Sequence, residues 1–312
     1  MSTIQTALGP IDADQLGFTL SHEHVALQVP FVRHYYPWLG DPVAVREGSI
    51  RELREAKAGG VDAVIELTTP DLGRNAALLA EISRESGVHL VVATGLWRDL
   101  PAAIDAQEID ALAEIFAREI EVGIDDTGVR AGVIKVANDA EGVSARGERV
   151  LRAAARTAKR TGVPISTHHW APLEVGRRQL ELFQQEQVPP HLICIGHTAD
   201  STDVDYIDDL LQAGIYISMD RYPGRAPRPL WQDRNRTVEA LIERGWADRL
   251  MLGHDYARDY RTPALPYQEQ HYLFLTRTAL PGLLADGVPQ ETIDRMMRDV
   301  PRRFLAGESA PA

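Results

Sequence analysis

The sequence predicts an α/β fold of the (β/α)8 TIM-barrel class, formed as a single domain by residues 1–312. Short apolar runs alternate with helical segments along the chain, which is typical of parallel strands joined by crossover helices. Eight such units in 312 residues favour a closed barrel. An open doubly wound sheet usually carries a glycine-rich phosphate loop after its first strand, but here His22-Glu-His24 takes that place.

The predicted strands are short and apolar, and most contain several β-branched residues. They are residues 18–27, 61–67, 89–96, 129–137, 163–168, 192–197, 215–220 and 249–255. The helices between them are predicted at residues 49–58, 74–86, 108–121, 146–160, 174–187, 203–213 and 234–244, with terminal helices at 268–286 and 290–299. The first helix is placed from a capping box, in which Ser49 is followed by Glu52.

Three segments are expected to lie outside this alternation. Residues 1–17 form an N-terminal arm or short hairpin, residues 28–48 a long loop rich in aromatic residues and proline, and residues 307–312 a frayed tail. The aromatic part of the loop, residues 31–38, could contact a second subunit or fill space under the barrel mouth, and the sequence leaves both interpretations open.

The charge balance excludes several classes of partner. The chain has 33 basic and 45 acidic side chains, its net charge is −12, and no basic patch dominates. This argues against a nucleic acid or an anionic membrane as a partner, and the charge does not identify the small-molecule substrate that we expect. Cys194 is the one cysteine, so an intrachain disulfide is excluded and a reducing compartment is favoured. No signal peptide and no membrane-spanning segment is evident, so we expect a cytoplasmic protein.

Residues of the types that bind metals occur at one end of the predicted strands. His22 and His24 are two residues apart, so in a strand their side chains point to the same face and can reach one metal ion. Because the carboxyl ends of barrel strands open on one face, later strand ends supply further candidates. These are Lys135 in the fourth strand, His168 and His169 at the end of the fifth, His197 at the end of the sixth, and His254 and Asp255 at the end of the eighth. A lone histidine is more often structural, but this mixture of nitrogen and carboxylate groups suits zinc or another first-row transition metal.

Lys135 lies inside an apolar strand, where an unpaired ammonium group would be costly. Burial lowers the pKa of a lysine and favours the neutral amine, which can react with carbon dioxide to give a carbamate able to bridge two metals. The alternative is an ion pair with a carboxylate such as Glu66 or Asp255, since pairing is a common fate of buried charges.

Several motifs carry a resemblance that covers nearly the whole chain. They are Leu8-Gly-Pro10, Gly17-Phe-Thr-Leu-Ser-His-Glu-His24, Thr94-Gly-Leu-Trp97, Gly123-Ile-Asp-Asp-Thr-Gly-Val-Arg-Ala-Gly-Val-Ile-Lys135, Gly162-Val-Pro-Ile-Ser-Thr-His168, Ile195-Gly-His-Thr-Ala-Asp-Ser-Thr-Asp203, Met219-Asp-Arg221 and Gly253-His-Asp255. Together these motifs are highly specific, and they resemble the phosphotriesterase family of the amidohydrolase superfamily.

The resemblance implies a binuclear metal centre. His22, His24 and Asp255 would hold the more buried metal, while His168 and His197 would hold the more exposed one. Lys135, as its carbamate, and a hydroxide would bridge the two metals. The implied metals are zinc first, with cobalt, manganese or iron as alternatives, and family members are often homodimers, so a homodimer is expected.

The resemblance also implies residue roles. The bridging hydroxide would attack the substrate, and Asp255 would accept the proton. Asp200 and Arg221 occupy positions that resemble a proton relay, although a structural ion pair would use the same residues. The expected substrate contacts are Trp97, Arg221 and Tyr256. His169 resembles no ligand and is expected behind the ligands or at the surface.

The expected activity is hydrolysis of a lactone or another carboxylic ester, with promiscuous phosphotriesterase activity, because an arginine at position 221 resembles the lactonase branch. Trp97 instead resembles the organophosphate branch, and the loops at 222–231 and 256–266 are short for either branch. An amide hydrolase of N-acyl amino acids and a non-enzymatic metal-containing binding protein are the alternatives. Lys135 argues against a mononuclear deaminase, because one metal needs no bridging carbamate.

Overall fold

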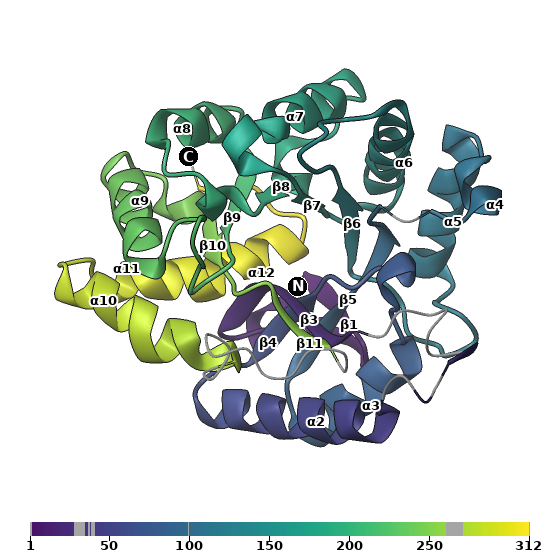
Figure 1. The fold of residues 1–312 in the computed structure, drawn as a ribbon, viewed down its shortest axis with the longest axis horizontal. Helices are drawn as coiled ribbons and strands as arrows, with labels where there is room; N and C mark the ends of the chain where they lie inside the picture. The colour runs from purple at the N-terminus through teal and green to yellow at the C-terminus, as the bar shows by residue number, and fades with distance from the viewer. Residues whose placement is uncertain are drawn as a thin grey trace.

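The computed structural model describes residues 2–27, 35, 36, 38, 41–98, 100–259 and 271–311. Nine strands form one sheet in the order β10-β9-β8-β7-β6-β5-β4-β3-β11, and every neighbouring pair is parallel. The sheet curls around a central axis and the helices lie outside it (Figure 1). The predicted (β/α)8 barrel is confirmed.

Strands and helices alternate in the predicted order. The strands of the barrel are β3 (Thr19–Leu27), β4 (Ala63–Glu66), β5 (His89–Leu96), β6 (Val133–Ala137), β7 (Ile165–His168), β8 (Ile193–Gly196), β9 (Tyr216–Met219), β10 (Leu250–Leu252) and β11 (Tyr256–Asp259). The helices are α2 (Pro42–Ala58), α3 (Ala76–Ser86), α4 (Ala102–Asp105), α5 (Ile109–Glu121), α6 (Ala145–Thr161), α7 (Val175–Gln185), α8 (Val204–Gln212), α9 (Trp231–Glu243), α10 (Leu280–Ala285), α11 (Gln290–Asp294) and α12 (Val300–Leu305).

The barrel closes through a strand that is broken in two. β10 pairs with β9, while β11, which follows it in the chain, pairs with β3, so the two halves of the strand join the two ends of the sheet. Between them Asp255 has a left-handed backbone (φ 52°), and its N–H donates to the carbonyl oxygen of His22 at 2.9 Å. Residues 256–259 therefore form a strand, although the sequence predicts a loop there.

The two ends of the chain fill the amino-terminal end of the barrel. An antiparallel hairpin of β1 (Thr3–Thr6) and β2 (Gly9–Asp12) confirms the predicted short hairpin. Ile4 of this hairpin and Phe304 of α12 belong to the same buried apolar cluster as Val91 of β5 and Met251 of β10. The interior at this end is thus packed, which leaves the carboxyl end of the strands for a site.

The tail adds to this contact. Ser2 Oγ donates to Glu308 Oε1 at 2.7 Å, and the Tyr216 hydroxyl donates to the Glu308 carbonyl oxygen at 2.8 Å. The expectation that the chain frays from residue 307 is therefore wrong at Glu308, because both its side chain and its backbone are held.

The first predicted helix begins earlier than expected. α2 starts at Pro42, with Asp41 as its N-cap accepting from the N–H of Ala44 at 2.9 Å. Ser49 lies inside the helix and donates its hydroxyl to the Val25 carbonyl oxygen of β3, so it joins helix to strand and caps nothing. The loop predicted at 28–48 is wrong for residues 42–48, which belong to α2, while residues 28–34, 37, 39 and 40 lie outside the described residues. Trp38 is described and is 72% exposed. No helix in the described ranges is long and apolar enough to cross a membrane.

Candidate metal centre

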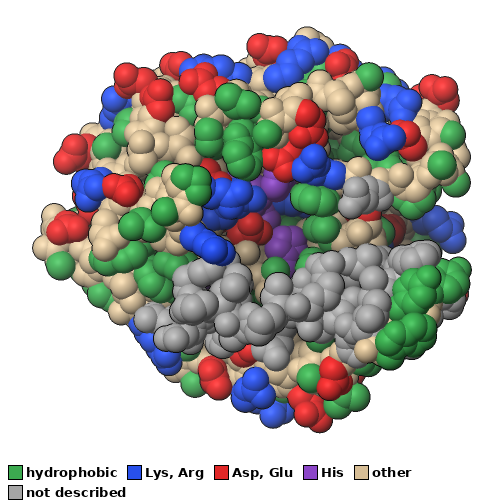
Figure 2. Space-filling view, viewed as in Figure 1, with side chains coloured by type: hydrophobic (Ala, Val, Ile, Leu, Met, Phe, Trp, Pro, Cys, Tyr) green, Lys and Arg blue, Asp and Glu red, His purple; other side chains and the backbone are tan. Residues whose placement is uncertain are grey.

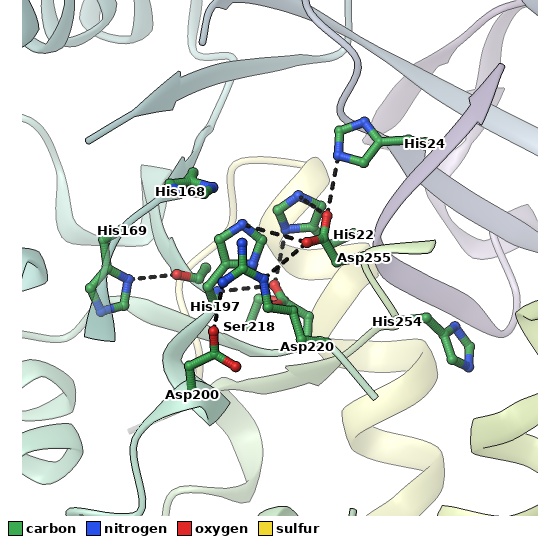
Figure 3. Close-up of polar contacts among 12 residues, drawn as sticks. His22, His24, His168, His169, His197, Asp200, Ser218, Asp220, His254 and Asp255 are labelled. Atoms are coloured by element: carbon green, nitrogen blue, oxygen red, sulfur yellow. Dashed lines mark hydrogen bonds and ion pairs between the residues drawn. The ribbon is translucent and has the colours of Figure 1, made fainter. Parts of the chain in front are cut away.

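Nitrogen and carboxylate groups converge at the carboxyl mouth of the barrel (Figure 3). His22 and His24 lie on β3, and Asp255 lies between β10 and β11. Ligand-type atoms of these three residues all lie within 4.8 Å of one another, which is a spacing that one metal ion can span. The Nε2 atoms of His22 and His24 are 3.5 and 3.2 Å from Asp255 Oδ1.

Backbone strain is concentrated at this mouth. His197, Arg221 and Asp255 follow β8, β9 and β10, and all three have φ between 52° and 67°. Such a conformation costs a non-glycine residue on the order of 1–3 kcal/mol and occurs most often at functional sites. Burial alone would raise the pKa of Asp255, but the hydrogen bond with His24 and the charge of the Arg221 guanidinium help to hold it well below its ordinary value. The Asp255 carboxylate is therefore ionised.

Lys135 of β6 reaches the same cluster. The residue is 1% exposed, and its Nζ lies 3.0 Å from Nε2 of His22. Burial lowers the pKa of Lys135 to about 8, and the nearby Asp255 only partly offsets this. Within the described residues no ion pair joins Lys135 to Glu66, which instead accepts hydrogen bonds from Thr68 and from the Val25 N–H. A glycine is needed opposite Lys135, because a Cβ on Gly95 would lie 2.0 Å from the Lys135 carbonyl oxygen.

His168 and His197 form the other side of the cluster. Their ring centroids are 4.4 Å apart, and His197 stacks on His22 at 4.5 Å. Burial lowers the pKa of both imidazoles, that of His168 to about 4, so both rings are neutral. Nε2 of His168 is buried without a hydrogen-bond partner in the described chain, and Asp139 Oδ2 is 3.7 Å away, too far for a hydrogen bond. A buried nitrogen without a hydrogen-bond partner is suited to bind a metal ion, so His168 is consistent with a metal site here.

Asp220 orients two of these histidines, a role that the sequence did not reveal. It is fully buried after β9, where Oδ2 lies 2.9 Å from His22 Nδ1 and Oδ1 lies 2.7 Å from His197 Nδ1. A carboxylate on Nδ1 fixes the ring and leaves Nε2 for a metal. Although His22, His197 and Asp220 also lie within metal-binding spacing, these hydrogen bonds explain the arrangement better. The available signal was a carboxylate at the end of the seventh predicted strand.

Replacing Asp220 by asparagine is expected to weaken metal binding by about 10–100-fold, because the amide keeps the shape and loses the charge that orients two imidazoles. Competition with a chelator for cobalt or zinc measures this affinity. Asp209→Asn is the matched control, since the Asp209 side chain is 59% exposed and pairs with Arg177. Equal affinities in both variants would mean that Asp220 does not orient the metal-binding histidines.

Arg221 and Asp200 form an ion-pair network beside Asp255. Arg221 donates through Nε to Asp255 Oδ2 at 3.0 Å and through Nη1 to Asp200 Oδ2 at 2.6 Å. Arg234 of α9, which is fully buried, donates to Asp200 Oδ1 at 2.8 Å, and nothing in the sequence marks this arginine. Burial alone would lower the pKa of Arg221, but Asp255 and Asp200 raise it. The guanidinium therefore stays charged and can orient both carboxylates without carrying a proton between them.

A cavity of about 200 Å³ opens onto the cluster. Figure 2 shows histidine and acidic side chains within a hollow on this face. Trp97 and Arg221 line the cavity together with Leu72 and Ala257, and the Trp97 ring meets His168 edge-on at 5.9 Å. Trp97 and Arg221 thus lie where a substrate could reach them.

The predicted substrate contact at Tyr256 does not hold. Its hydroxyl donates to Glu52 of α2 at 3.1 Å, and its ring packs edge-on against Tyr272 at 4.9 Å. Side chains alternate along a strand, and on β11 this places Ala257 at the cavity and Tyr256 against the helices.

His169 points away from the cluster in Figure 3. Its Nδ1 lies 2.6 Å from the carbonyl oxygen of Gly196, and its Nε2 lies 3.0 Å from the Tyr206 hydroxyl. His169 is fully buried, so the prediction of a surface place is wrong, and its place behind the proposed ligands stays a prediction.

The fold and the cluster together define a class of protein: a TIM barrel whose mouth carries the histidine, carboxylate and lysine groups of a metal-dependent hydrolase. The chain belongs to the phosphotriesterase family, whose profile, "Phosphotriesterase family", matches residues 2–305. This is a family of binuclear metal-dependent hydrolases that act on small molecules.

Relatives match the chain over almost its full length. It is 40% identical to the "Phosphotriesterase homology protein" of Mycobacterium tuberculosis, over 98% of both chains. It is 32% identical to the "Aryldialkylphosphatase" of Saccharolobus solfataricus, over 95% of this chain and 97% of that one. The solved structure of the phosphotriesterase from Mycobacterium tuberculosis matches with a TM-score of 0.90 at 38% identity, covering 99% of this chain and 100% of that chain. The "N-acetyltaurine hydrolase" of Danio rerio is a more distant relative, 24% identical over 97% of both chains.

Proposed function

We propose that the chain is a binuclear metal-dependent hydrolase that opens a lactone or cleaves another carboxylic ester, with weak phosphotriesterase activity. The observation that carries this proposal is the convergence of His22, His24, His197 and Asp255 beside Lys135, together with the orphaned nitrogen of His168. This donor set supports metal-dependent hydrolysis. It does not select the substrate, so the ester or lactone is proposed on the separate grounds given below.

The donor groups divide into two sets. His22, His24 and Asp255 would hold one metal ion, and His168 and His197 would hold the other. Lys135, as its carbamate, would join the two sites. The lowered pKa of Lys135 supports this role, because only the neutral amine reacts with carbon dioxide. Zinc suits a set rich in imidazole nitrogens, and cobalt, manganese or iron are the alternatives.

When bound, two such metal ions supply hydroxide at neutral pH and stabilise the anion that forms on the scissile oxygen. Asp255 is the proposed proton acceptor, because it is ionised and its side chain is 20% exposed. Arg221 is a positioning residue that holds Asp255 Oδ2 at 3.0 Å. Since Arg221 stays charged, the proton would leave Asp255 through water in the cavity, and Asp200 would hold Arg221 in place.

A small carbonyl substrate is favoured for two reasons. The cavity of about 200 Å³ is smaller than the roughly 300–1,000 Å³ of sites for drug-sized ligands. The arginine at position 221 is also the feature by which the sequence resembles the lactonase branch. Phosphotriesterase activity is proposed as a second, weaker reaction, and the match to a relative named "Aryldialkylphosphatase" supports its presence.

Removal of metal is expected to abolish lactone opening, and zinc or cobalt should restore it. The measurement is a hydrolysis panel of a lactone, an N-acyl amino acid and an aryl phosphotriester, run on metal-loaded protein before and after chelation. Fully metallated protein that turns over no lactone or ester would contradict the proposed substrate class.

An amide hydrolase acting on N-acyl amino acids is the second candidate. The observation that favours it is the full-length match to a relative named "N-acetyltaurine hydrolase". Faster turnover of the N-acyl amino acid than of the lactone in the same panel would support the amide-hydrolase function.

A further inference from the structure

A second cavity, of about 250 Å³, adjoins the proposed metal centre and shares Arg221 and Asp255 with it. The described residues that line it include four arginines and, as their one carboxylate, Asp255. The arginines are Arg221, Arg225, Arg228 and Arg234. Three of them, Arg221, Arg228 and Arg234, share the carboxylates of Asp200 and Asp255, so this group carries one more positive than negative charge in a chain whose net charge is −12. Basic side chains border the hollow in Figure 2.

Arg234 of α9 holds the loop before this helix, which carries Arg225 and Arg228. Arg234 donates to the Pro229 carbonyl oxygen at 3.0 Å and to the Asp220 carbonyl oxygen at 2.9 Å. Gly224 allows the loop to fold this closely, since it has φ 79° and a Cβ there would lie 2.0 Å from the Pro229 carbonyl oxygen. Because Arg234 is fully buried, its role is to anchor the loop rather than to meet a ligand.

One carboxylate, that of Asp200, contacts three of the guanidinium groups. Asp200 accepts hydrogen bonds from Arg221 and Arg234, and Arg228 Nε forms an ion pair with Asp200 Oδ2 at 3.3 Å. The Asp200 side chain is 2% exposed, so it lies behind the cavity and faces no ligand. The Arg221 guanidinium also contacts Asp255, whose charge the proposed metal would share.

Among these arginines, Arg228 has a side chain that is fixed by its neighbours and also exposed to solvent. Its guanidinium lies over the Trp170 ring, 5.4 Å from the ring centroid, while its side chain is 41% exposed. An arginine held by an aromatic face and one carboxylate keeps further N–H groups available, and its planar fork matches a carboxylate. Arg228 is therefore positioned to bind an anion next to the proposed metal centre.

We propose that the substrate carries a carboxylate, which Arg228 binds in this second cavity while the scissile carbonyl group lies in the cavity over the metal centre. The inference rests on the proposed hydrolytic function and narrows its substrate class to anionic esters, lactones or amides. A neutral substrate of the same shape would offer no charged partner to the accessible guanidinium group of Arg228.

The test compares the mono-4-nitrophenyl ester of glutaric acid with the same ester whose free carboxylate is methylated. For zinc-loaded protein we expect kcat/KM to be at least about tenfold higher for the anionic ester, as for a hydrogen bond to a charged group. Arg228→Met should bring the ratio of the two values close to one, and Arg228→Lys should keep part of it. Arg236→Met is the matched control that should keep the full ratio, because the Arg236 side chain is 68% exposed on the outer helix α9.

Two outcomes would overturn the inference while leaving the hydrolytic function intact: equal kcat/KM values in the unaltered protein, or an unchanged ratio in Arg228→Met. Failure to cleave either ester would count against the proposed function instead. Binding then decides the inference, measured by calorimetry on the same zinc-loaded protein with the monoamide of glutarate, which carries one carboxylate, and the diamide, which carries none. Tighter binding of the monoamide that is lost in Arg228→Met supports the anion site, and equal binding of the two compounds overturns it.

Discussion

Lys135→Ala is expected to lower the metal content from about two ions per chain to one or fewer. Hydrolysis should fall by at least about a hundredfold, since even groups behind metal ligands affect activity by 10–100-fold. The physical reason lies in the position of Lys135, whose Nζ is 3.0 Å from His22 Nε2. As a carbamate it would add an anionic, two-oxygen ligand that alanine cannot replace. Elemental analysis of dialysed protein measures the metal content.

A second property separates a carbamate from an ordinary buried lysine. Metal uptake by the unaltered, metal-free protein should be slow in buffer depleted of carbon dioxide and faster with added bicarbonate, whereas Lys135→Ala should show no such dependence. Lys159→Ala is the control, because Lys159 is an exposed lysine on α6 that donates to the Glu186 carbonyl oxygen. Full metal content in Lys135→Ala would remove the bridging role.

Asp255→Asn is expected to lower kcat by about a thousandfold, the range that a positioned general base contributes. The amide cannot accept the proton, and it loses the charge that faces the Nε2 atoms of His22 and His24. Asparagine suits this position, because Asp255 has φ 52° and asparagine adopts the left-handed region more easily than most residues. The substitution therefore changes the chemistry while the backbone is kept.

Steady-state kinetics on metal-loaded Asp255→Asn provides the measurement, with the thermal midpoint as a check on folding. Asp205→Asn serves as the control, since the Asp205 side chain is 85% exposed on α8 and pairs with Arg244. A kcat within a few-fold of the unaltered protein would exclude Asp255 as the proton acceptor.

The sequence was sufficient to predict which groups meet at the barrel mouth. Parallel strands of a barrel all end on one face, so His22, His168 and Asp255 could be brought together from widely separated segments without knowing any distance. The spacing of His22 and His24 needed only the two-residue repeat of a strand. These inferences used topology, which alternating apolar runs predict well.

Details that depend on orientation between neighbours could not be predicted. The hydrogen bonds of Asp220 to the Nδ1 atoms of His22 and His197 connect the ends of three different strands, and no local sequence pattern predicts them. The outward direction of Tyr256 results from the break at Asp255, which begins a new strand with its own alternation.

Competing local signals explain the error at the first helix. Asp41 and Pro42 are a suitable N-cap and first residue, but Ser49 and Glu52 form an equally plausible start farther along. The structure uses the Ser49 hydroxyl to contact β3, a tertiary contact that the sequence of the helix does not encode.

The most direct test of the two-metal centre is stepwise reconstitution. Metal-free protein is titrated with zinc or cobalt while hydrolysis of the best substrate of the panel is followed, and the bound metal is counted at each step. We expect the rate to rise until about two ions are bound per chain and to stay constant afterwards. A rate that saturates at one bound ion, or full activity in the metal-free chain, would contradict the account.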